Sequence, residues 1–91
     1  NANYIVGQTY QHANDYDNAE EAYSELLQFS KDNGGAYYEA KANFGLAQVK
    51  AAKGEKEGAK IMLLNTLKMA KNMRENDLVA EIDAELNKLG N

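Results

Sequence analysis

The 91-residue chain contains no cysteine, no proline and no tryptophan, and its only histidine is His12. Without cysteine it can form neither disulfides nor cysteine-ligated zinc sites. His12 has no second histidine or cysteine at the spacing that metal sites need, and no serine or cysteine nucleophile can be grouped with it. Phosphate-binding glycine loops are also missing. The sequence therefore predicts no catalytic residue, no metal site and no cofactor, and we expect no enzyme activity.

Long hydrophobic runs are missing as well. The longest strictly apolar run is Ile61 to Leu64, far shorter than the roughly 20 residues that span a membrane. Residues with β-branched side chains are few, whereas alanine, leucine, glutamate and lysine are abundant, which favours helices over strands. We therefore expect a single all-α domain over residues 1–91 and no membrane partner. The cellular compartment stays open, because exported bacterial proteins can also lack cysteine, and a cytoplasmic location is favoured. Because the chain begins with asparagine, we also expect it to be a fragment of a longer protein.

Charge is distributed in three blocks. The net charge is −4, which argues against nucleic acid as a partner. Residues 1–34 carry −5, residues 35–74 carry +5 and residues 75–91 carry −4. One interpretation is helix-end chemistry, because basic residues stabilise helix C-termini. The other is attraction between copies of the chain.

Helix-breaking residues separate five segments with apolar residues at three- and four-residue steps. In residues 16–31, for example, Ala19, Ala22, Tyr23, Leu26 and Leu27 share one face. Short connections between the segments predict antiparallel neighbours. The expected helices span residues 2–13, 16–31, 36–53, 56–74 and 77–89.

The sequence also repeats with a period of forty residues. Ala19 aligns with Ala59, and Leu27 aligns with Leu67. The alignment needs no gap and predicts a first unit at 3–42, a second at 43–82 and a remainder at 83–91. Such periods are typical of helical repeat proteins, whose units stack because one hairpin cannot bury its own apolar face.

The stretch GQTYQHANDYDNAEEAYSELL, residues 7–27, resembles a tetratricopeptide repeat (TPR). It has a small residue at Gly7, an aromatic at Tyr10, the turn Asn14-Asp15-Tyr16, an alanine at Ala19 and an aromatic at Tyr23. The second unit departs from the pattern, with Lys50 and Lys56 at aromatic positions. The period resembles that of extended TPRs. The resemblance implies antiparallel hairpins stacked as a short right-handed solenoid of five helices.

Within each hairpin, small residues are expected at the close helix crossing. We expect Gly7 to lie against Ala19 and Ala47 against Ala59, with Tyr10 and Tyr23 filling the space between hairpins. The resemblance further implies non-catalytic binding of a peptide segment or partner domain in a concave groove. The groove residues that it implies are Tyr4, Gln8, Gln11, His12, Lys41, Phe44 and Gln48, with Glu81 and Lys88 added by the last helix.

Two further hypotheses stay open at this point. The chain could be a regulatory sensor or oligomerisation module of a larger bacterial signalling or transcription protein. The helix expected over 56–74 carries Met62, Met69 and Met73, which suit either core packing or an adaptable interface. We expect a homodimer through this helix, the fourth, or through the fifth, with Ile61 and Leu64 among the buried residues.

Overall fold

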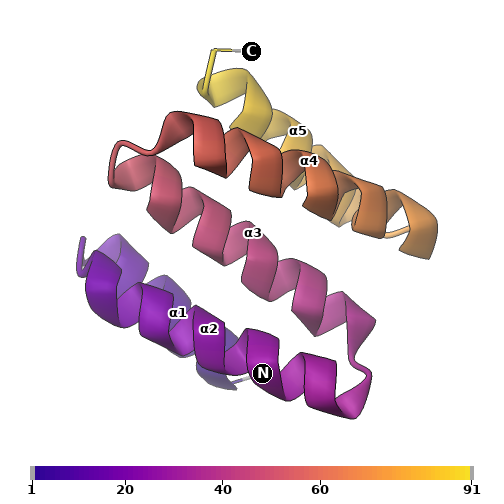
Figure 1. Ribbon diagram of the computed structural model, residues 1–91, viewed down its shortest axis with the longest axis horizontal. Coiled ribbons are helices and arrows are strands. Elements are labelled where there is room, and N and C mark those ends of the chain that lie inside the picture. Colours follow the sequence, from indigo (N-terminus) through magenta and orange to yellow (C-terminus); the bar gives the residue numbers. More distant parts are fainter. Residues whose placement is uncertain (1, 91) are drawn as a thin grey trace.

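The computed structural model describes residues 2–90 as five α-helices, with no strand in that range (Figure 1). The predicted all-α fold class is therefore confirmed, and each predicted helix end lies within two residues of the observed one. The helices are α1 (Ala2–His12), α2 (Tyr16–Asn33), α3 (Ala36–Ala52), α4 (Lys56–Met73) and α5 (Asn76–Lys88).

Each helix packs against the next one along the chain. In addition, α1 touches α3 and α3 touches α5, whereas α2 and α4 have no close backbone approach. In Figure 1, α1 lies behind α2 and α5 lies behind α4, with α3 between the two pairs. The odd-numbered helices therefore share one side of the molecule, and α3 separates the two even-numbered ones.

The backbone repeats at the forty-residue period of the sequence. Helix α2 spans 16–33 and α4 spans 56–73, while α3 begins at 36 and α5 at 76. A residue of positive φ ends each of these long helices, Gly34 after α2 and Arg74 after α4. Glycine is the usual residue in this left-handed conformation, because a Cβ atom makes it less favourable.

The turns after α1 and α3 are also equivalent. Asn14 and Gly54 both have positive φ, at 61° and 91°. Each turn closes with a backbone hydrogen bond: the amide of Asp15 donates to the carbonyl of Tyr10 at 2.9 Å, and that of Glu55 donates to Lys50 at 3.0 Å. The two hairpin turns are thus one backbone structure used twice.

Two clusters of buried side chains form the core. The larger one joins α3, α4 and α5, and Met62, Met69 and Met73 pack against it half-buried. Core packing is therefore the role of these methionines. The smaller cluster, at the first hairpin, consists of Ala19, Tyr23 and Val49, with Tyr4, Tyr16 and Leu46 beside it. The larger cluster contains Ala40, Phe44, Ala47, Ala59, Leu63, Ala70, Leu78, Ile82, Leu86 and Leu89.

The ring of Tyr23 is enclosed between two glycines. A Cβ atom built on Gly7 would lie 2.5 Å from Cε1 of Tyr23, and one built on Gly45 would lie 2.5 Å from its Cζ. Both distances are too short for a real side chain, so only glycine fits at either position around this fully buried ring. The three atoms nearest to a Cβ built on Gly7 all belong to the Tyr23 ring, and the expected contact between Gly7 and Ala19 stays a prediction.

In the second unit, the position equivalent to Tyr23 holds a smaller side chain. The residue forty positions after Tyr23 is Leu63, and the one forty after Gly7 is Ala47. Both are buried in the larger cluster. A leucine leaves room for the methyl group of alanine, whereas the tyrosine ring requires glycine. From the first unit to the second, the buried side chain on the second helix of the hairpin becomes smaller, from Tyr23 to Leu63. The residue facing it becomes larger, from Gly7 to Ala47.

We predict that Gly7→Ala and Gly45→Ala each lower the free energy of unfolding by about 1–3 kcal/mol, because the new methyl group overpacks the Tyr23 ring. Urea denaturation measures the effect. Gly58→Ala is the matched control, since the nearest atoms to its Cβ all belong to the flexible Lys50 side chain, with Cδ at 3.0 Å. This control should be neutral or stabilising by up to about 1 kcal/mol. Equal losses in all three variants would contradict the packing argument.

Candidate functional site

A chain of side-chain hydrogen bonds crosses the three odd-numbered helices. The Tyr23 hydroxyl donates to Oε1 of Gln11 at 2.7 Å. Nε2 of Gln11 donates to Oε1 of Gln48 at 3.1 Å, and Nε2 of Gln48 donates to Oε1 of Glu85 at 3.0 Å. Nζ of Lys88 lies 3.4 Å from the same Glu85 oxygen. We call Gln11, Gln48 and Glu85 the amide chain, because two of its three members are amides.

The residues of the amide chain are spaced by 37 positions, not by the forty of the sequence repeat. The difference is three residues, which is close to one helical turn. A residue of one odd-numbered helix therefore contacts the next odd-numbered helix about one turn before the residue that follows it by forty positions. The sequence repeat pairs Gln8 with Gln48, whereas the structure pairs Gln11 with Gln48.

Aromatic rings and a lysine form a second contact between α1 and α3. Nζ of Lys41 lies 4.6 Å from the centre of the Tyr4 ring and 5.8 Å from that of Tyr37. These distances are within the range of cation–π attraction. The Tyr4 ring in turn lies 5.9 Å from the ring of Tyr23, centre to centre. Tyr4 and Lys41 thus connect the surface of this side to the buried tyrosine.

The ionisation of these groups follows from their surroundings. Burial of the Lys41 ammonium opposes its charge, but Tyr4, Tyr37 and Glu81 outweigh that effect and hold the pKa of Lys41 above its ordinary value. Burial, reinforced by Tyr4, raises the pKa of the Tyr23 hydroxyl well above its ordinary value. Lys41 therefore stays a cation at neutral pH, and Tyr23 stays a neutral hydrogen-bond donor to Gln11.

Most of the predicted groove residues lie together on this side. Gln11 and Gln48 are hydrogen-bonded, and Tyr4 contacts Lys41. Gln8 is half-buried on α1, between Tyr4 and Gln11 in sequence, and His12 is exposed in the last turn of α1. The structure thus gives the positions of these side chains, and their role in binding stays a prediction.

Phe44 is a correction. Its side chain is only 4% exposed and belongs to the core cluster of α3, α4 and α5. The reason is that α3 is the middle helix and is covered by neighbours on more than one side, so a large apolar residue on it is recruited into the core. An aromatic anchor at Phe44 for a partner was therefore a wrong expectation.

Sequence reasoning missed two residues of this side. Glu85 accepts the hydrogen bond from Gln48, and the Tyr37 ring lies beside Lys41. Glu85 could have been found from the spacing, because it follows Gln48 by the same 37 residues that separate Gln48 from Gln11. Tyr37 could have been found as well, because it precedes Lys41 by four residues on α3 and such residues share one helix face.

The two glutamines of the amide chain can form further hydrogen bonds. Glutamine has two N–H donors and an acceptor oxygen with two lone pairs, so Gln11 and Gln48 each retain bonding capacity after forming the amide chain.

Within residues 2–90, no cluster of three or more histidine, cysteine or carboxylate side chains is placed to hold a metal ion. No helix in that range is long and apolar enough to cross a membrane.

We predict that Gln48→Ala lowers the free energy of unfolding by about 1–2 kcal/mol, because it removes two part-buried hydrogen bonds that connect α1, α3 and α5. Urea denaturation measures the loss. Gln28→Ala is the matched control, because its amide bonds only the exposed Asp32 on the same helix. The control should change the stability by less than about 0.5 kcal/mol. An equal response of both variants would show that the amide chain does not contribute.

Comparisons of the chain with protein-family models, with curated proteins and with solved structures find no match. Any functional conclusion therefore has to come from the residues and geometry of this chain. The observations that bear on it are the repeated hairpin and the polar surface of the odd-numbered helices.

Proposed function

We propose that this chain is a non-catalytic interaction module that binds a peptide segment or partner domain on the side formed by α1, α3 and α5. The observation that carries the proposal is the amide chain, which holds two glutamines of different helices in one fixed arrangement. We further propose that the two and a quarter units form a right-handed TPR-like solenoid. The forty-residue recurrence of helix bounds and positive-φ residues supports that arrangement.

Preorganisation is the proposed mechanism of binding. Side chains that are already fixed by their neighbours lose little conformational freedom when a ligand arrives, so less of the interaction energy is spent on ordering. The remaining N–H and C=O capacity of Gln11 and Gln48, together with the half-buried Gln8, matches the alternating groups of an extended peptide backbone. The exposed edge of Tyr37 and the half-buried Tyr4 supply apolar contact.

Charge on this side favours a particular ligand chemistry. Lys41 is held as a cation between two tyrosine rings at one end of α3. At the other end of α3, Glu85 is paired with Lys88 and with Gln48. A peptide lying across the three helices would therefore place an acidic side chain near Lys41. The ligand that we propose is an extended segment with an acidic residue flanked by apolar ones.

A second candidate function is that of a regulatory sensor or oligomerisation module within a larger protein. The specific observation in its favour is on α4, where Ile61 and Leu64 are largely exposed. Two large aliphatic side chains one turn apart on a helix surface form a compact apolar contact area. This candidate uses a different side of the molecule, so the two functions can be tested separately.

We predict that peptides selected from a random display library on the wild-type chain bind at least about fivefold more weakly to Gln8→Ala and to Lys41→Ala. Each change removes a hydrogen bond or a charge contact of about 1 kcal/mol or more. Fluorescence anisotropy with the selected peptides measures the affinity. Gln28→Ala, a glutamine of α2 on another side, is the matched control and should bind like the wild type.

Hydrogen exchange on addition of a selected peptide gives the second measurement. Protection is expected in α1 and α3, with α2 and α4 unchanged. Protection confined to α2 and α4, or equal affinity of all variants, would contradict peptide binding on the side formed by α1, α3 and α5.

A further inference from the structure

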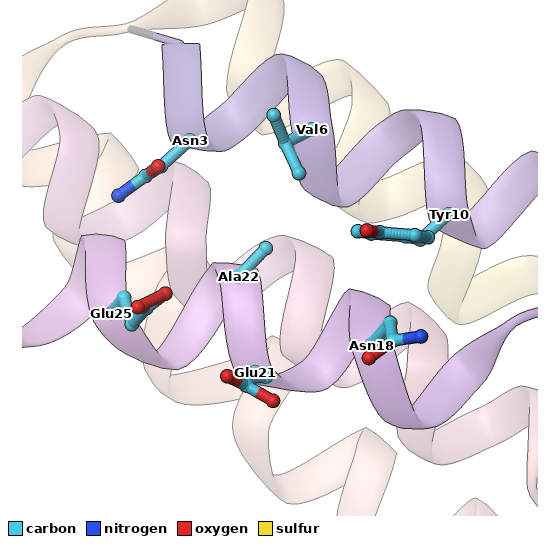
Figure 2. Close-up of a pocket in the computed structure, with 7 residues that line it drawn as sticks. All are labelled: Asn3, Val6, Tyr10, Asn18, Glu21, Ala22 and Glu25. Atoms are coloured by element: carbon cyan, nitrogen blue, oxygen red, sulfur yellow. The ribbon is translucent and has the colours of Figure 1, made fainter.

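The first hairpin carries a groove on the side opposite to its contact with α3. The groove lies between α1 and α2 and has a volume of about 180 Å³, larger than the roughly 150 Å³ cavity that can hold benzene. Figure 2 shows Val6 and Tyr10 from α1 and Ala22 from α2 pointing into it, with Glu21 and Glu25 along the α2 rim. The complete lining is Asn3, Val6, Tyr10, Asn18, Glu21, Ala22 and Glu25.

Tyr10 belongs to this groove and not to the space between hairpins, where the sequence pattern placed it. Its side chain is exposed, and Val6 next to it is 42% exposed. The groove is open because Ala22 is small. The residue forty positions later is Met62, which packs half-buried against the larger core cluster.

The rim of the groove is acidic, and within residues 2–90 neither Glu21 nor Glu25 forms a salt bridge. On α2, Asp17 and Glu20 bind Nζ of Lys53 at 2.9 and 3.3 Å. Glu21 and Glu25 are exposed at the groove. Helix α2 as a whole has five acids and one lysine, a net charge of −4.

Helix α4 has the opposite character. It has four lysines and one glutamate, a net charge of +3. Ile61 and Leu64 are 62% and 54% exposed, and Lys68 and Lys71 are exposed as well. These four residues follow one another at three- and four-residue steps, so they share one face of the helix. We call Ile61, Leu64, Lys68 and Lys71 the α4 stripe.

We infer that two copies of this chain pair with each other, the α4 stripe of each copy entering the α1/α2 groove of the other. Apolar Ile61 and Leu64 meet Val6, Tyr10 and Ala22, and the lysines meet the carboxylates of Glu21 and Glu25. Within one chain this contact cannot form, because α3 lies between α2 and α4. Charge complementarity between the acidic rim of the groove and the lysines of the α4 stripe identifies the occupant as a second copy.

Two-fold symmetry allows both contacts to form at once. Glu21 of the groove and Ile61 of the stripe are forty residues apart and occupy equivalent positions on α2 and α4. Each copy carries both a groove and a stripe, so a two-fold axis between two copies exchanges the two contacts. Such an interface is isologous and closes as a dimer. It leaves the α1, α3 and α5 side free, so this inference does not depend on the proposed peptide binding.

Sedimentation equilibrium of the full chain tests the inference. We expect a dimer at low ionic strength whose dissociation constant rises with salt, because exposed charges are screened. Replacing both aliphatic residues, Ile61→Ser with Leu64→Ser, should raise the dissociation constant at least about tenfold, while circular dichroism stays unchanged. A wild type that remains monomeric at high concentration and low salt would overturn the inference.

Charge exchange tests the groove and the stripe together. We predict that Glu21→Lys/Glu25→Lys and Lys68→Glu/Lys71→Glu are each monomeric, because like charges then face each other. An equimolar mixture of the two variants should dimerise again, since both contacts regain opposite charges. The matched control, Asp77→Lys/Asp83→Lys, changes two exposed acids of α5 and should dimerise like the wild type. Dimers of either single variant alone, or a mixture that stays monomeric, would show that the groove does not receive the stripe.

Discussion

The packing of the Tyr23 ring between Gly7 and Gly45 determines how the first three helices are arranged. The ring belongs to α2, and its two glycine neighbours belong to α1 and α3. Because no side chain separates the ring from either backbone, both helices approach it closely. The hydroxyl at the end of the same ring reaches Gln11. A single buried side chain thus fixes three helices and begins the amide chain.

The amide chain depends on this arrangement. Gln11 and Gln48 are close enough to bond only because α1 and α3 lie side by side next to the buried tyrosine. The contact then continues to Glu85 on α5. The polar surface is consequently coupled to the core, and its side chains have defined positions before any ligand is present. That coupling is the physical basis for proposing binding on this side.

The two units differ most where they are exposed. Their turns and buried alanines are equivalent, as with Ala19 and Ala59, because close helix packing allows few alternatives. On α2 and α4, by contrast, Glu20 and Glu21 of the first unit are replaced by Lys60 and Ile61 in the second. The two units therefore pack alike but differ in the charge of their surfaces. The proposed dimer requires this difference, because the acidic surface of one copy then meets the basic surface of the other.

The sequence by itself determined the five helices, their ends and the forty-residue repeat, because helix periodicity and turn residues are local properties. The resemblance to a tetratricopeptide repeat, rather than the periodicity, implied that Tyr4, Gln11, Lys41 and Gln48 share one side. Only the tertiary structure decided which residues touch: the ring of Tyr23 beside Gly7, Phe44 in the core, and Glu85 in the amide chain. These contacts depend on the shift of about one turn between neighbouring odd-numbered helices. That shift follows from side-chain packing between helices, and local sequence patterns do not record such packing.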